Sequence, residues 1–347
     1  MLRTFHKSIS GMTGKIIRLG FVILIMVVNH TFGQRIEVLT EGTKASLRGL
    51  SVVDDETIWV SGSNGTVGRS LDGGISWQWS RVKRFESNDF RDIEAFGKTD
   101  AVIMAIGSPS YILRTHDGAQ TWQVCFVDTS SAMFLDALEF WNEQSGSVIG
   151  DPVNNKFFIG RTFDGGRSWQ RIPYQHLPVA EEGEACFAAS GTNLRAMNKR
   201  EALFVSGGKR SSLFIRDKKV LLPFDQGNES SGANSIAVKN NKTFIVVGGD
   251  YLNKDRRENN CFITKNGGKT WRRPQVAPFG YRSCIEYIFG KNWVVCGLSG
   301  VDISQDDGMQ WQNISTEAYH VVRKSKRGHT VFFAGQNGKV GKLLIER

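Results

Sequence analysis

The sequence predicts an all-β fold, a seven-bladed β-propeller of four-stranded blades. Three observations lead to this prediction. A tight-turn motif that ends in tryptophan recurs along the chain, seven apolar segments begin at the spacing that four-stranded blades require, and helical periodicity is almost absent. With 40% hydrophobic and 22% charged residues, the composition is that of a chain that buries a large core.

The N-terminal segment differs from the rest of the chain. It contains four basic residues and no acidic residue, followed by the apolar run 19–28 and by the small residues Thr31 and Gly33. This order is typical of a signal peptide cleaved after Gly33, and an uncleaved anchor is the alternative. We predict a signal peptide over 1–33, a single propeller domain over 34–347, and an exported protein that is periplasmic, at the cell surface or secreted.

The recurring motif has the pattern S/T-x-D-G-G-x-S/T-W. An Asp or Asn at its centre accepts hydrogen bonds from backbone amides, the glycines take positive φ, and Ser or Thr closes the turn from either side. The tryptophan begins the next strand and packs between neighbouring sheets. We therefore expect structural roles for Asp72, Asp117, Asp164, Asn266 and Asp306 (the last in a degenerate copy), and for Trp77, Trp122, Trp169, Trp271 and Trp311.

Seven apolar strand starts set the number of blades. The fourth unit has lost the turn motif, although 213–222 keeps strand character. The seventh unit supplies only three strands, and we expect 35–39 to supply the missing outer strand, because pairing the two chain ends removes both open sheet edges. The starts lie at Leu47, Phe90, Phe134, Asn193, Asn234, Tyr281 and Tyr319.

The turn motif resembles the Asp box of sialidases, sortilin-type receptors and the photosystem II stability and assembly factor-like propellers. The last group resembles the whole chain after residue 33 in box pattern and blade number. This resemblance implies boxes at the blade periphery, away from any ligand. It also implies an assembly-factor-like scaffold, since plant and cyanobacterial members act as assembly factors and an arginine-rich patch is implicated in holding a membrane-protein segment.

Charged residues recur on the first strands, which line the channel of a propeller and where packing alone does not explain them. Two interpretations remain open: a polar ring that binds a peptide, carboxylate or glycan through bidentate arginine contacts, or arginines and carboxylates that pair between blades. We expect ligand contacts from four arginines, oriented by four carboxylates. The candidates are Arg48, Arg91, Arg195 and Arg282 with Asp92, Asp136, Glu139 and Glu286, and Glu94 lies among them.

The third unit is the longest, and its extra stretch 178–192 either folds over the channel mouth or is a tolerated insertion. Five cysteines are too few and too widely spaced for a disulfide scaffold. Cys284 and Cys296 are at a separation that adjacent strands could bring together, so one bridge and buried free thiols are both open.

A secreted sialidase-like glycoside hydrolase is the alternative class. Arg48, Arg91 and Arg282 with Tyr281 or Tyr287 could supply its residues, but the Arg-Ile-Pro of that family is absent near the first strand. We therefore assign no catalytic residue, and the chain is more consistent with a binding protein than with an enzyme. The six histidines form no ligand pair at short spacing and no phosphate-binding loop is present, so we expect no metal and no cofactor.

The sequence thus predicts an exported, monomeric, non-enzymatic propeller that binds an envelope or secreted protein or peptide through a charged, channel-facing surface. A glycan ligand is the alternative. No basic run with interleaved aromatic residues points to nucleic acid.

Overall fold

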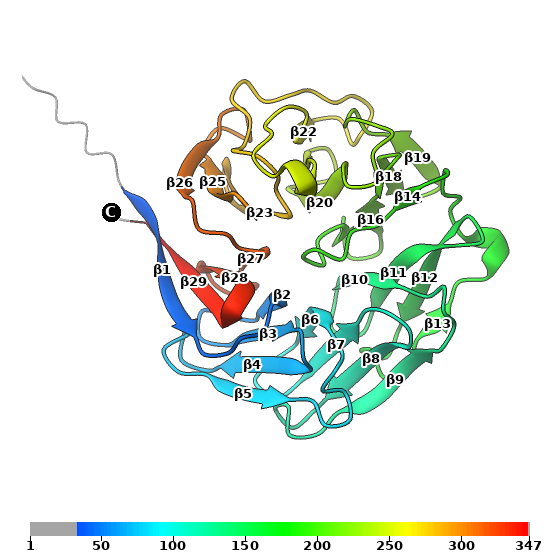
Figure 1. Cartoon of the computed structure of the whole chain (residues 1–347), viewed down its shortest axis with the longest axis vertical. Helices are drawn as coiled ribbons and strands as arrows, with labels where there is room; N and C mark the ends of the chain where they lie inside the picture. Colours follow the sequence, from blue (N-terminus) through cyan, green and yellow to red (C-terminus); the bar gives the residue numbers. More distant parts are fainter. Residues whose placement is uncertain (1–32, 346–347) are drawn as a thin grey trace, which may run out of the picture.

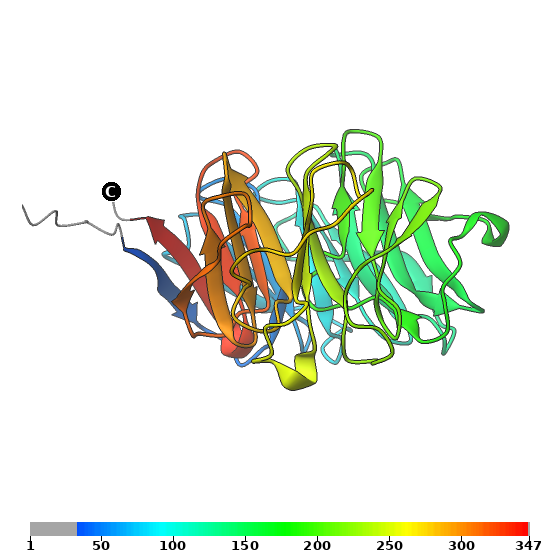
Figure 2. The same ribbon diagram turned by 90° about the horizontal axis from the view of Figure 1, so that it is seen from above.

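The computed structural model describes residues 33–345, so nearly all of the predicted signal peptide lies outside the described residues. Seven small antiparallel sheets stand around a central channel like blades (Figure 1), and the ring is a flat disc when it is seen from the edge (Figure 2). The predicted all-β seven-bladed propeller is confirmed.

Blades 1 to 3 each contain four strands that follow one another along the chain, from the channel outward. Blade 1 comprises β2 (Leu47–Val52), β3 (Ile58–Gly62), β4 (Thr66–Ser70) and β5 (Gln78–Arg81); blade 2 comprises β6 (Phe90–Ala95), β7 (Ala101–Ala105), β8 (Ser110–Thr115) and β9 (Gln123–Asp128); blade 3 comprises β10 (Leu135–Phe140), β11 (Gly146–Val153), β12 (Lys156–Thr162) and β13 (Gln170–Arg171).

Blades 4 to 6 continue the ring. In blade 5 a single bridge between Ile263 and Arg272 takes the place of a fourth strand. Blade 4 comprises β15 (Leu194–Ala196), β16 (Ala202–Val205), β18 (Ser212–Ile215) and β19 (Lys218–Leu221); blade 5 comprises β20 (Ala233–Val238), β21 (Phe244–Gly248) and β22 (Cys261–Thr264); blade 6 comprises β23 (Cys284–Phe289), β24 (Asn292–Gly297), β25 (Gly300–Ser304) and β26 (Gln312–Ser315).

Five short elements are additional to the strands of the blades. A two-stranded sheet joins β14 (Glu184–Ala185) to β17 (Gly207–Gly208). Three 3₁₀ turns are also present: η1 (Tyr174–His176), η2 (Tyr251–Asn253) and η3 (Gln336–Gly338).

Blade 7 closes the ring with both ends of the chain. It comprises β27 (Val321–Lys324), β28 (Val331–Ala334), β29 (Lys339–Ile345) and, as its outer strand, β1 (Gln34–Glu41). β1 pairs with β29 in antiparallel register from Gln34 opposite Ile345 to Glu41 opposite Lys339. This arrangement confirms the predicted closure by the N-terminal strand and leaves neither terminal strand unpaired.

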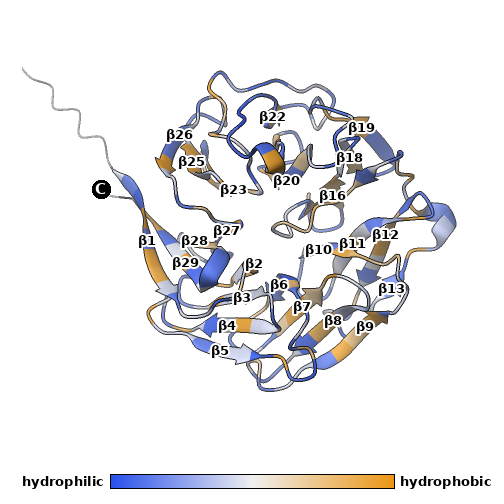
Figure 3. Ribbon diagram, viewed as in Figure 1, coloured by the Kyte–Doolittle hydropathy of each residue, from blue (hydrophilic) through white to orange (hydrophobic). Residues whose placement is uncertain are grey.

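The interior strands are buried over their full length because each blade is covered on both faces by its neighbours. Every residue of β3, β7 and β21 is buried. Hydrophobic residues from adjacent blades form the clusters that hold the ring together. Figure 3 shows orange hydrophobic segments on the strands and blue hydrophilic residues in the turn η3 and many loops.

The tight-turn motif forms the hairpin between the third and fourth strands of a blade, at the periphery of the ring. In the first copy, Asp72 accepts a hydrogen bond from the Ser76 amide at 2.9 Å, and the Ser70 hydroxyl accepts one from the Gly74 amide at 2.9 Å. The same contacts recur at Asp164 and at Asn266. A carboxylate or an amide oxygen therefore serves equally as the acceptor at the centre of the turn.

Cys284 on β23 lies directly opposite Cys296 on β24. Both are fully buried and both are free thiols. Of the two alternatives for this pair, the structure has the free thiols.

Candidate functional site

One residue from each blade lies at the same level near the end of the innermost strand. Six of these residues pair with the second residue of the following strand and Glu286 pairs with the third, so they form one ring around the channel. The ring consists of Ser51, Glu94, Glu139, Arg195, Ala237, Glu286 and Arg323, and all seven line a pocket of about 490 Å³. We call this pocket the channel mouth.

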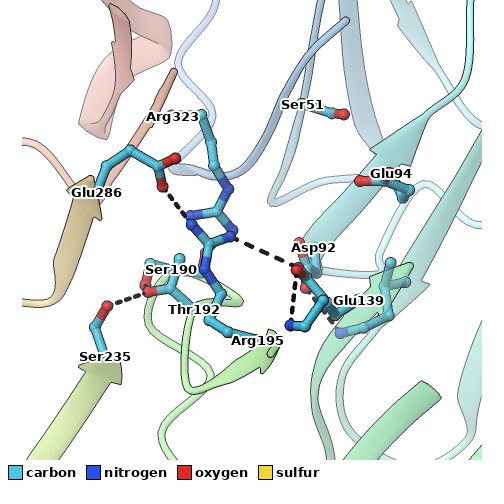
Figure 4. A network of polar contacts seen from close by, with 12 residues as sticks. Ser51, Asp92, Glu94, Glu139, Ser190, Thr192, Arg195, Ser235, Glu286 and Arg323 are labelled. Atoms are coloured by element: carbon cyan, nitrogen blue, oxygen red, sulfur yellow. Dashed lines mark hydrogen bonds and ion pairs between the residues drawn. The ribbon is translucent and has the colours of Figure 1, made fainter. Parts of the chain in front are cut away.

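Arg195 is the centre of an ion-pair network in the channel mouth (Figure 4). Its guanidinium contacts the carboxylate of Glu286 and lies 3.6 Å from that of Glu139, which come from blades 6 and 3. Glu139 also accepts a hydrogen bond from the backbone amide of Ala196 at 3.1 Å. The network therefore joins three blades and fixes the orientation of the Arg195 side chain.

A second cation enters the mouth from the turn after β27. The Lys326 ammonium donates to Glu94 at 2.6 Å and to the Ser51 hydroxyl and the Ala95 carbonyl at 3.0 Å each. Arg323 lies between this group and Arg195 along the ring and donates to the Ser190 carbonyl at 3.2 Å. No ion pair between Arg323 and a carboxylate is found in residues 33–345.

The loop 186–192 closes the channel behind the mouth. It appears as a green loop in the middle of the ring in Figure 1. The Ser190 hydroxyl donates to the Ser283 carbonyl at 2.8 Å, and the Thr192 and Ser235 hydroxyls are 2.5 Å apart. Gly191 has a φ of +66°, and a β-carbon there would lie 2.2 Å from the Asp92 carboxylate, so this position favours glycine. We call this loop the plug.

Burial governs the ionisation of the carboxyl groups at the mouth. Burial raises the pKa of Asp92 to about 8, although Arg323 and the amides of Leu138 and Ile93 lower it. Burial also raises the pKa of Glu94 and of Glu286, against the influence of Lys326 and Arg195. Burial lowers the pKa of Arg195, but the carboxylates of Glu286 and Glu139 outweigh burial. The pKa is therefore raised above its usual value, and this guanidinium stays charged.

The structure brings together half of the predicted site residues. Asp92, Glu139, Arg195 and Glu286 all line the channel mouth. Arg48 and Arg91 contact the plug instead, where they donate to the carbonyls of Ala189 and Ala188 at 3.2 and 3.4 Å. These two arginines contribute hydrogen bonds that hold the plug in place.

The remaining two predicted site residues are buried away from the mouth. Arg282 donates through Nε to Asp302 on β25 at 2.7 Å, and both side chains are fully buried. Asp136 is also fully buried, and neither of its oxygens has a hydrogen-bond partner in the described part of the chain. Arg282 and Asp136 therefore do not contribute to the surface of the channel mouth, because both side chains are fully buried.

Sequence reasoning did not assign Arg323 and Lys326 to the site. Arg323 is the fifth residue of the seventh strand start, which begins at Tyr319. Its equivalence to Glu94 and Glu139 becomes visible only when the strands are paired in register. Lys326 lies in a turn, where the sequence pattern gives no direction to a side chain. The stretch 178–192, for which two interpretations were open, supplies the plug.

The residues proposed for a sialidase-like site are not gathered in the channel mouth. Arg48, Arg91, Arg282 and Tyr281 do not line it, whereas Tyr287 does. The Tyr281 hydroxyl donates to Asn234 at 2.7 Å inside the core, and Arg282 is paired with Asp302. Over residues 33–345 no group of three or more His, Cys, Asp or Glu side chains is placed to hold a metal ion. Within the same range, no helix has the length and apolar character needed to cross a membrane.

The fold and the charged mouth define a class, the seven-bladed β-propellers with a plugged channel. No protein-family model matches the chain, and no curated protein matches it either. Membership of an Asp-box family therefore stays a prediction.

Solved structures match the chain along most of its length. "YCF48 bound to D1 peptide" is 17% identical with a TM-score of 0.62, covering 90% of this chain and 94% of that one. YCF48 from Cyanidioschyzon merolae is 13% identical with a TM-score of 0.64, covering 90% and 100%. The WD40 β-propeller domain of Doa1 is 15% identical with a TM-score of 0.61, covering 91% and 98%. At these identities the similarity shows the fold alone.

Proposed function

We propose that this protein is a docking scaffold that binds a segment of a partner polypeptide at the channel mouth. The observation that carries the proposal is the mouth itself, a pocket of about 490 Å³ in which Arg323 forms no ion pair at contact distance with any carboxylate of the described residues. Support also comes from the fold, since a YCF48 propeller of the same architecture binds a peptide.

The charges of the mouth indicate the chemistry of the segment. Arg323, Lys324, Lys326 and Arg327 are contributed by β27 and the turn that follows it, whereas Glu139 and Glu143 face them from blade 3. A polypeptide that carries an acidic side chain or its C-terminal carboxylate near blade 7 and a basic side chain near blade 3 complements this distribution. Arginine is suited to the carboxylate because its two-pronged guanidinium forms bidentate hydrogen bonds.

Capture experiments test this proposal with two matched variants. Residues 34–347 are immobilised as wild type, as a mouth variant (Arg323→Gln, Lys326→Gln, Arg327→Gln) and as a plug-side control (Arg91→Gln), with circular dichroism to verify folding. We expect wild type and control to capture the same protein from an envelope extract, and the mouth variant to bind the purified partner at least about tenfold more weakly.

If all three proteins capture the same partners with equal affinity, the mouth is not the docking surface.

We also propose that the protein acts outside the cytoplasm. This part rests on residues 1–33 and is tested separately, by fractionating cells and sequencing the N-terminus of the mature protein. A mature N-terminus at Gln34 is the expected result.

A further inference from the structure

Tryptophan fills most of the interfaces between neighbouring blades. Each turn motif sends its tryptophan into the hydrophobic cluster between its own blade and the preceding one, as Trp122 does between blades 1 and 2 and Trp169 between blades 2 and 3. Trp77, Trp271 and Trp311 do the same at three further interfaces. Blade 4 has no such motif, and its cluster with blade 3 contains no tryptophan, although Trp141 of blade 3 lines the pocket at this interface.

An open groove lies at this interface between blades 3 and 4, which are adjacent in Figure 1. Its volume is about 930 Å³, and its floor consists of Ile149 and Ile159 from blade 3 with Phe204 and Phe214 from blade 4. The rings of Phe204 and Phe214 stack with centroids 4.3 Å apart. We call it the blade 3–4 groove.

The other blade without a turn motif shows that loss of the motif does not by itself leave such a groove. At the interface between blades 6 and 7 the hollow measures about 100 Å³ and is lined by Leu343 of β29 and by Trp293. Side chains of the closing blade thus occupy that space. At blade 4 the corresponding space stays open, with the small residue Ala202 in its lining.

The rim of the blade 3–4 groove carries an excess of positive charge, because its lining holds five arginine and lysine residues against the two carboxylates of Glu201 and Asp217. Arg161, Arg200 and Lys218 are exposed, and none of them forms an ion pair with a carboxylate in the described range. The other two rim cations are neutralised, Arg216 by Glu201 at 3.1 Å and Lys219 by Glu184 at 2.8 Å. The rim therefore attracts acidic groups toward an aromatic and aliphatic floor.

We propose that the blade 3–4 groove binds a partner polypeptide that inserts a large aromatic side chain, flanked by acidic residues, where a tryptophan of the chain itself lies at five other interfaces. The inserted ring stacks on the phenylalanine floor and removes roughly 150–250 Å² of aromatic surface from water. Acidic neighbours pair with Arg161, Arg200 and Lys218 on the rim. This groove is separate from the channel mouth, and the proposal does not rest on docking there.

Fluorescence anisotropy with synthetic peptides tests the aromatic anchor. The probe is a short fluorescein-labelled peptide with one tryptophan between pairs of glutamates, and its matched control has alanine in place of the tryptophan. We expect the tryptophan peptide to bind residues 34–347 at least about tenfold more tightly than the alanine peptide. Equal affinity for the two peptides, or no saturable binding of either, overturns the proposal.

Charge variants locate the binding site. Arg161→Glu with Lys218→Glu changes two exposed side chains, so folding is preserved, and we expect about a tenfold loss of affinity for the tryptophan peptide. Lys242→Glu, on the exposed turn of blade 5, is the matched control and leaves affinity unchanged. If Arg323→Gln in the mouth weakens the peptide and the groove variant does not, the groove proposal fails while docking at the mouth survives.

Filling the groove from within gives an independent readout. Ala202→Trp places an indole in the open space, and we expect it to abolish binding of the tryptophan peptide without lowering the thermal midpoint of unfolding. A variant that is folded and still binds the peptide with wild-type affinity contradicts the proposal.

Discussion

Burial dominates the ionisation of Asp136 at the centre of the ring. Burial raises its pKa well above the usual range and the neighbouring Asp151 carboxylate raises it further, although Arg91 and the Asp151 amide lower it. Burial also raises the pKa of Asp151 to about 6 and that of Asp92 to about 8. By contrast, Arg282 and Asp302 satisfy each other in the core. Buried carboxyl groups with a raised pKa make the free energy of unfolding depend on pH, whereas a buried ion pair that stays charged does not do so near neutrality.

We predict that Asp136→Asn flattens the pH dependence of stability. The pKa of each of these three carboxyls is higher in the folded than in the unfolded chain, so the folded protein binds extra protons and its free energy of unfolding falls as pH rises above about 4. Removing one titrating group reduces this fall between about pH 5 and pH 8. Urea denaturation at several pH values measures it, and parallel curves for the variant and wild type would refute the prediction.

Strand geometry explains why only half of the residues predicted for the site line the channel mouth. Alternation along a strand assigns side chains to faces only when the strand is regular. The register shifts between Leu47 and Gly49 in β2 and between Phe90 and Asp92 in β6, at the positions of Arg48 and Arg91. Arg282 precedes β23 altogether. The sequence shows which residues of the first strands are charged, but bulges of this kind are invisible in it.

The peripheral hairpins are the elements with the most regular internal geometry. In the third copy, Asp164 accepts hydrogen bonds from the amide and hydroxyl of Ser168 and from the hydroxyl of Thr162. Burial raises the pKa of Asp164, but the hydrogen bonds from Ser168 and Thr162 together outweigh it and lower this pKa to about 2. The carboxylate thus acts as the hydrogen-bond acceptor for donors of the turn that have no backbone carbonyl partner within the turn.

We predict that Asp164→Ala lowers the free energy of unfolding by about 1–2 kcal/mol, because several donors of the turn lose their acceptor. Asp164→Asn should cost less, since Asn266 makes the equivalent bond to the Thr270 amide at 3.0 Å. Chemical denaturation of the two variants measures both values. Equal losses for alanine and asparagine would show that the charge, not the acceptor geometry, stabilises the turn.

At the level of elements, local patterns were sufficient for the blades and insufficient for the plug. The turn motifs and strand starts predicted seven units because the residues that make each motif recognisable in the sequence also form the hairpins and strands of the blade. The course of 186–192 depends on partners far away in the sequence, such as Ser283 and Arg48. The blade 3–4 groove likewise results from side chains that two blades fail to supply, which no local pattern records.

The whole molecule depends on the pairing of its first and last strands. β1 is hydrogen-bonded only to β29, and hydrophobic side chains such as Ile36 and Leu39 pack on the cluster that joins blades 6, 7 and 1. β1 also covers the backbone edge of β29. Closure therefore contributes both packing energy and protection of a strand edge.

We predict that deleting residues 34–41 lowers the thermal midpoint of unfolding by at least about 5 °C, since loss of a packed strand costs several kcal/mol and each kcal/mol corresponds to about 2–4 °C in larger domains. The exposed edge of β29 should also promote self-association. Differential scanning calorimetry and light scattering test this, with residues 34–347 as the control. An unchanged midpoint together with a monomeric variant would contradict the prediction.

The closing blade also sets an order of events during synthesis. β1 leaves the ribosome first, but its partner β29 is made last, so the N-terminal strand must remain unpaired until translation is almost complete. A chain that stops short of β27 cannot form the native ring. Any factor that guards the nascent protein therefore has one early and exposed strand to hold, and its release is coupled to the arrival of the C-terminus.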